Sequence, residues 1–167
     1  MPEDRPLRVI ISTIPHLKQR YNTIGDWQIQ DDGTILIRVS RMPPISSRAE
    51  APISGRRQEF LVAIHELIEA FLCSEKDITT ESVDEFDKKH YETPKMQYTE
   101  EEPGDHPESP YRIQHSIATG IERTLAYPLR VNWHYYDLNM KRLMEEYDEQ
   151  RGREERPELK HDSNTGR

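Results

Sequence analysis

The sequence predicts an α+β fold in which a small antiparallel N-terminal sheet of about three strands packs on about four helices. Three observations support this prediction. Segments rich in β-branched residues are confined to the first 40 residues, helical periodicity dominates after residue 54, and the 167-residue chain suits one core. We therefore expect a single domain over residues 1–150. We expect residues 151–167 to be a disordered tail, because they contain too few apolar side chains to order the chain.

The strands are predicted from composition and turn chemistry. A β-branched segment begins at Leu7 and ends before Pro15, because proline removes a donor from the strand ladder. Further strands are expected near residues 26–31 and 34–40, joined by the turn sequence Asp-Asp-Gly at 31–33. Residues 34–40 are the candidate edge strand that would align an extended peptide.

The first two helices follow a loop rich in proline. Ser54 is the expected N-cap of a central helix that ends near Ser74. Thr79 or Thr80 caps a second helix that runs to about Tyr91. Residues 93–110 have little apolar content and are expected to form a long loop, which in a compact domain is either functional or poorly ordered.

Two more helices are expected after this loop. Ser109 and Pro110 have the chemistry of a helix start, and Pro128 ends that helix. Asn132 can cap the last helix. The third helix is expected to pack through a stripe at steps of four, and the last through aromatic and Met side chains. The two stripes are Ile113, Ile117, Ile121 and Leu125, and Trp133, Tyr136, Met140, Leu143, Met144 and Tyr147.

Composition narrows the class of function. The chain has 31 acidic and 23 basic residues and a formal charge of −8, which argues against binding nucleic acid through phosphate contacts. Its one cysteine, Cys73, excludes an internal disulfide and fits a reducing compartment. No signal peptide or membrane-spanning run is apparent, so we expect a cytoplasmic protein in whichever cell makes it. The sequence sets no oligomeric state.

The central helix contains the strongest chemical motif. His65, Glu66 and Glu69 interrupt an apolar run in the pattern HExxE. Residues four apart lie on the same face of a helix, so His65 and Glu69 can bind one ion. Buried carboxylates are costly unless they are paired or coordinate a metal. The pattern differs from the zinc-peptidase motif HExxH only in its last ligand, and zinc accepts a carboxylate oxygen there.

A third metal ligand must come from elsewhere in the chain, because catalytic zinc normally has three protein ligands. His115 and Glu122 lie on a polar stripe of the third predicted helix, together with Thr119. Asp84 and Asp87 share a neighbouring face of the second. Each stripe could instead be ordinary polar structure, so His115, Asp87, Asp84 and Glu122 all remain candidates, the first two ahead of the others.

Two functions fit these residues. In the first, the protein is a metal-binding, metalloprotease-like hydrolase that acts on a protein or peptide. His65, Glu69 and His115 or Asp87 hold zinc, or Fe²⁺, Mn²⁺ or Ni²⁺, and Glu66 is the general base. In the second, the same residues form a structural metal site or a buried polar network, and the acidic surface binds another protein.

The motifs resemble a family of small proteins from bacteriophages and bacterial genomes. The shared segments are HELIEA at residues 65–70, VDEFD at 83–87, EPGD at 102–105 and PYRIQH at 110–115, with Ile-Glu at 121–122. The resemblance implies that these segments meet at one site and implies no particular activity. It also implies that the cell is bacterial or phage-infected, and that the partner in the second function is a host or virion protein. More distantly, a sheet followed by an HExx helix is similar to the zincin metallopeptidase core, although Glu69 stands where zincins have His.

Overall fold

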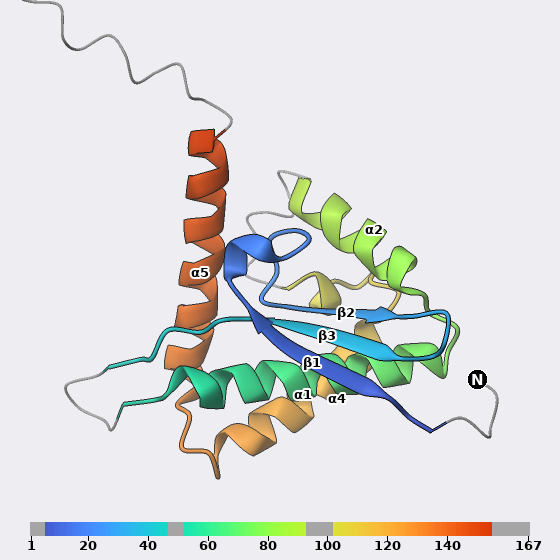
Figure 1. The fold of residues 1–167 in the computed structure, drawn as a ribbon, viewed down its shortest axis with the longest axis horizontal. Coiled ribbons are helices and arrows are strands. Elements are labelled where there is room, and N and C mark those ends of the chain that lie inside the picture. Colours follow the sequence, from blue (N-terminus) through green and yellow to red (C-terminus); the bar gives the residue numbers. More distant parts are fainter. Residues whose placement is uncertain (1–5, 47–51, 93–101, 155–167) are drawn as a thin grey trace, which may run out of the picture.

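The computed structural model describes residues 6–46, 52–92 and 102–154. Within these ranges, three strands, β1 (Val9–Ile14), β2 (Gly25–Ile29) and β3 (Ile35–Ser40), precede four helices. The helices are α1 (Gly55–Ser74), α2 (Thr80–Glu92), α4 (Arg112–Ala126) and α5 (Trp133–Glu154), and two short 3₁₀ turns are η1 (His16–Lys18) and η2 (Pro103–Asp105). This arrangement confirms the predicted α+β class (Figure 1). The zincin-like core remains a prediction.

The sheet is mixed, so the prediction of an antiparallel sheet was wrong for one of its two pairings. Its strand order is β1-β3-β2, with β1 parallel and β2 antiparallel to β3. The link after β1 reverses the chain and the β2–β3 hairpin reverses it again, which leaves β1 and β3 pointing the same way. Residues 34–40 were also wrongly predicted as an edge strand, because β3 is hydrogen-bonded on both sides and β2 is the edge nearest α2.

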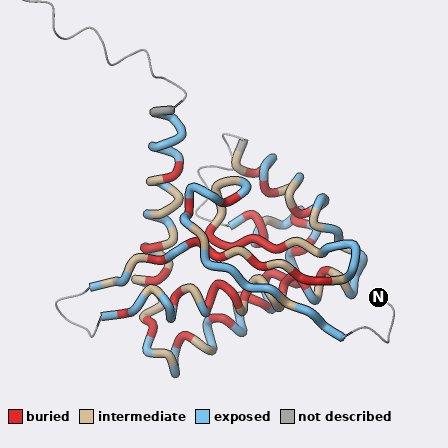
Figure 2. The backbone as a smooth tube through the Cα atoms, in the orientation of Figure 1, coloured by how far each residue is buried: buried red, intermediate tan, exposed pale blue. Residues whose placement is uncertain are grey.

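The core lies between the sheet and α1. Ile35, Ile37 and Val39 alternate along β3 and are each 1% exposed, as expected for a strand with one face on a core. α1 begins at its predicted cap, since the Ser54 side chain accepts a hydrogen bond from the Arg57 backbone N–H. Figure 2 shows the buried residues concentrated on β2, β3 and α1, while β1 is mostly exposed. α1 therefore holds its polar residues on a helix that is packed against the sheet.

α4 packs on α1 and shows the reverse of the predicted orientation. The expected core residues Ile113, Ile117 and Ile121 are 71%, 46% and 37% exposed, and only Leu125 packs against the core. The buried face instead contains His115 and Glu122, together with Ala118 and Ala126. Polar side chains tolerate burial when each has a hydrogen-bonding partner, and α1 supplies those partners here. The apolar stripe was therefore assigned to the wrong side of this helix.

α4 also begins later than expected. The first hydrogen bond of the α type runs from the His115 N–H to the Tyr111 carbonyl, and Ser109 does not cap the helix. The buried Tyr111 side chain bonds to Asp87, which fixes the chain before the helix starts. By contrast, the predicted caps Thr79 and Asn132 are confirmed by bonds from Ser82 N–H and Tyr135 N–H.

α5 stands beside the sheet and projects beyond it (Figure 1). The predicted stripe residues Trp133, Tyr136, Met140, Leu143, Met144 and Tyr147 are all buried or half-buried, as is the polar Asn139. The helix continues through residues 151–154, which were predicted to belong to the tail. Residues 155–167 lie outside the described part of the chain. Much of the loop expected at 93–110 lies outside it as well. No helix in the described segments is long and apolar enough to cross a membrane.

Candidate metal centre

α1 presents His65 and Glu69 to α4 from one turn of its buried face. The two residues are 8% and 5% exposed, and the Nε2 atom of His65 lies 3.4 Å from Oε2 of Glu69. This is the geometry expected of i and i+4 positions on a helix. The surrounding residues of α1 are apolar and cannot pair with these two polar groups. His65 and Glu69 instead face α4, which can.

His115 of α4 completes a group of three donor atoms. Its Nδ1 lies 2.9 Å from Oε2 of Glu69 and 3.2 Å from Nε2 of His65. Three ligands bound to a tetrahedral zinc ion lie about 3.3–3.6 Å apart, given bonds of about 2.0–2.2 Å. The separations seen here are close to that value. His65, Glu69 and His115 therefore form a buried cluster that could hold a metal ion, the one group of its kind within the described ranges.

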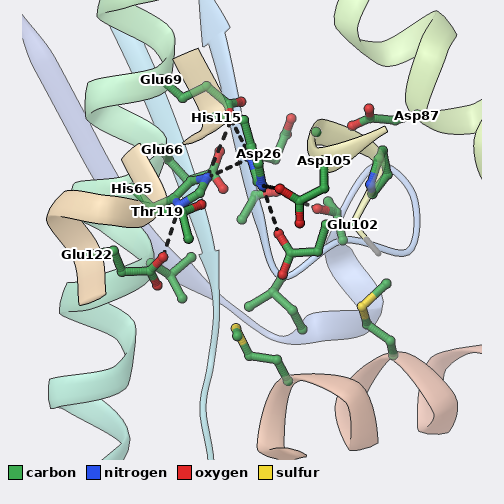
Figure 3. Close-up of a pocket in the computed structure, with 18 of the residues that line it drawn as sticks. Asp26, His65, Glu66, Glu69, Asp87, Glu102, Asp105, His115, Thr119 and Glu122 are labelled. Carbon is green, nitrogen blue, oxygen red and sulfur yellow. Dashed lines mark hydrogen bonds and ion pairs between the residues drawn. The ribbon is translucent and has the colours of Figure 1, made fainter. Parts of the chain in front are cut away.

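The atoms that face away from this group have partners of their own (Figure 3). His65 Nδ1 lies 3.0 Å from Oε2 of Glu122, and the Tyr136 hydroxyl donates to the other oxygen of Glu122. On the second imidazole, His115 Nε2 lies 3.2 Å from Oε2 of Glu102. A carboxylate on the outer nitrogen fixes the tautomer and orientation of a metal-binding histidine. Each imidazole thus points one nitrogen at the shared centre.

The Glu69 carboxylate is held in the same way. The Trp27 indole N–H of β2 donates to Oε1 of Glu69 over 2.9 Å, which leaves Oε2 directed at the two imidazoles. The η2 turn closes on His115, since a Cβ at Gly104 would lie 2.2 Å from the Cγ of the His115 ring. Any side chain at Gly104 would displace that imidazole. The sheet and a loop therefore both position the group presented by the helices.

The pKa shifts of the three cluster residues all favour the charged form of the side chain. Burial alone would lower the pKa of His115, but hydrogen bonds to Glu102 and Glu69 raise it to about 10. Burial would also lower the pKa of His65, yet its bonds to Glu122 and Glu69 raise it well above the usual range. For Glu69, burial opposes ionisation, and the two imidazoles lower its pKa to about 2. An incoming cation must therefore displace protons from the imidazoles.

Glu66 lies beside the cluster and outside the three donors. Burial raises its pKa well above the ordinary value, and the charge of Glu69 raises it further. A Cβ at Gly25 of β2 would lie 2.2 Å from Oε1 of Glu66, so only glycine leaves room for this carboxyl. A partly buried acid with a raised pKa next to a possible metal position is the usual environment of a general base.

The other candidate ligands lie nearby but are engaged differently. Asp84 forms an ion pair with Arg20. The Asp87 carboxylate accepts hydrogen bonds from the Tyr111 and Tyr21 hydroxyls, and Asp87 is outside the group of three donors. Burial raises the pKa of Asp87 to about 7, although the Tyr111 bond lowers it in part. We therefore regard Asp87 as a residue of the pocket wall.

Asp87→Asn should make the metal-free protein more stable above pH 7 and leave metal stoichiometry unchanged. The unfolded carboxyl ionises near 3.8 and the folded one near 7, so stability is lost as pH rises between these values. The loss is at most about 4 kcal/mol. Asparagine cannot ionise, so the variant should match wild type near pH 4 and exceed it at pH 8 in urea unfolding with chelator. Loss of bound metal would instead identify Asp87 as a ligand.

The cluster opens into a pocket of about 730 Å³. Its walls come from β2, α1, α2, η2, α4 and α5, and Figure 3 shows the labelled carboxylates converging on it. The sequence patterns had placed His65, Glu66, Glu69, His115 and Glu122 near one another. The resemblance had also brought Glu102 to this site, through the EPGD segment. Neither the patterns nor the resemblance had indicated Trp27 or Tyr136 as site residues, because no local pattern relates them to the helix motif.

These features define an α+β protein with a buried His-Glu-His group at the base of a pocket. No family model matches the chain, and no curated protein or solved structure matches it either.

Proposed function

We propose that this protein is a metal-dependent hydrolase in which His65, Glu69 and His115 hold the ion and Glu66 is the general base. The convergence of three buried donor atoms at the spacing of a tetrahedral site is the observation that supports the proposal most strongly. Each of the three residues also has a hydrogen-bond or ion-pair partner on the atom that faces away from the shared centre. This supports the proposal further, because such partners are typical of metal ligands.

Zinc is the proposed ion, since two imidazoles and one carboxylate with a pocket on the open side suit catalytic zinc. Fe²⁺, Mn²⁺ and Ni²⁺ are alternatives, because a carboxylate ligand makes the site harder than an all-imidazole set. A bound divalent ion would lower the pKa of a water in the pocket to about 7 and polarise the substrate carbonyl.

Glu66 would take one proton from the attacking water as its oxygen bonds to the carbonyl carbon. The same carboxyl would then give that proton to the leaving nitrogen as the C–N bond breaks, so the reaction consumes only water and substrate. The raised pKa of Glu66 suits both transfers near neutral pH. Glu122 and Glu102 would keep the two imidazoles in orientation throughout.

Metal content tests the proposal directly. Untagged protein purified without added metal, then equilibrated with zinc and desalted, should contain about one equivalent by elemental analysis. His65→Ala should contain almost none, while His134→Ala, which alters an exposed histidine of α5, should match wild type. Circular dichroism checks that each variant folds, and Glu69→Gln gives a second variant that preserves side-chain volume. Full metal occupancy in both His65→Ala and Glu69→Gln would refute the assigned ligands.

A second candidate function has support from α4. Its exposed Ile113, Ile117 and Ile121 form an apolar stripe on a surface helix, which is typical of a contact with another protein. In this alternative the cluster is a structural metal site or a polar network, and the stripe binds a host or virion protein. Ile117→Glu would then abolish partner binding, and Glu66→Gln would have no effect on it.

A further inference from the structure

The pocket beside the cluster has an unusual balance of charge. Four carboxylates lie at or next to the three donor atoms, namely Glu66, Glu69, Glu102 and Glu122. Six more acidic side chains line the rest of the described pocket wall, against two Lys or Arg side chains, Arg123 and Lys141. Acidic side chains therefore outnumber Lys and Arg by ten to two on this wall.

The basic side chains of the pocket wall do not reverse this balance. Lys141 lies 3.0 Å from Asp137 in an ion pair along α5, and the Arg123 guanidinium lies over the Trp133 ring at 5.4 Å. Enzymes that act on phosphate esters surround the transferred group with cationic or N–H donors. Within the described part of the pocket wall, the remaining basic residues are the two imidazoles of the cluster. The pocket is thus poorly suited to an anionic group.

Of the six carboxylates that line the pocket outside the cluster, two are bound to no Lys, Arg or Tyr side chain among the described residues. Asp105 of η2 and Glu145 of α5 line it, and neither is paired with Lys or Arg among the described residues. Met140 and Met144 line the same α5 wall and offer an adaptable apolar surface. An aliphatic stem that ends in a cation would fit this combination, because its stem meets thioethers and its charge meets carboxylates.

From these observations we infer that the pocket takes a substrate with a positively charged aliphatic side chain next to the bond that is hydrolysed, and rejects phosphorylated substrates. A lysine-like or arginine-like group is the chemical class that matches the wall. This inference rests on the proposed function, because the substrate would bind beside a divalent ion held by His65, Glu69 and His115.

Three amino-acid hydroxamates test the inference on the zinc-loaded protein. Lysine, norleucine and glutamate hydroxamates share the metal-binding group and differ in the charge of the side chain. By calorimetry, the lysine compound should bind about tenfold more tightly than norleucine, and glutamate more weakly than both. The advantage of lysine should shrink as salt is raised. Inorganic phosphate at millimolar concentration should not compete with any of them.

A matched variant separates the charge effect from general binding. Glu145→Gln should reduce the preference for lysine over norleucine severalfold and leave norleucine affinity unchanged. Glu149→Gln on the exposed side of α5 is the control and should behave as wild type. Equal binding of lysine and norleucine, tight phosphate binding, or no hydroxamate binding to zinc-loaded protein would each overturn the inference. Failure to load zinc would instead overturn the proposed function.

Discussion

Glu66→Gln should abolish most hydrolysis while leaving about one equivalent of metal bound. Glutamine has the shape of glutamate but cannot accept the proton of the attacking water, and loss of a general base typically lowers turnover by about 10²- to 10⁴-fold. Glu66 is outside the group of three donor atoms, so metal content should not change. The folded state should tolerate the substitution, because burial already disfavours the ionised form of this carboxyl.

Cleavage of a mixture-based peptide library, followed by mass spectrometry, measures this effect across many peptide sequences at once. Glu75→Gln, at the C-terminal end of α1 and exposed, is the matched control and should retain full turnover. If Glu66→Gln cleaves as fast as wild type, Glu66 is not the base. If neither protein cleaves any peptide when fully loaded with zinc, peptide hydrolysis is wrong and the structural alternative gains support.

Zinc should raise the midpoint of thermal unfolding by on the order of 10 °C. An ion that binds only the folded state stabilises it by about 4 kcal/mol at a concentration 1,000 times its dissociation constant. For a chain of this size, each kcal/mol moves the midpoint by about 2–4 °C. The cluster is buried between α1 and α4, so the donor atoms come together only in the folded protein.

The comparison is between protein treated with chelator and protein with excess zinc, followed by circular dichroism. Magnesium at the same concentration serves as the ion control, since it prefers oxygen ligands in octahedral geometry. His115→Ala should lose the zinc-dependent increase, and His134→Ala should keep it. An identical midpoint with and without zinc in wild type would favour a metal-free polar network of imidazolium and carboxylate groups.

The apolar stripe on α4 shows how local pattern can mislead. Ile113, Ile117 and Ile121 have the spacing of a core stripe, yet the polar stripe that includes His115 and Glu122 is the buried one. Periodicity identifies the faces of a helix but not which face meets the core. That choice depended on α1, whose own buried polar residues offered partners for one stripe and not for the other.

The sequence by itself determined the relation between His65 and Glu69, because residues four apart on a helix share a face whatever surrounds them. It also determined the β2–β3 hairpin and most helix caps, which depend on neighbouring residues. Only the tertiary structure decided that His115 joins the pair, and that Glu122 and Trp27 fix their orientation. Those contacts join residues separated by 46, 57 and 42 positions, respectively. No local preference specifies such pairs, since they arise from the packing of α4 and β2 against α1.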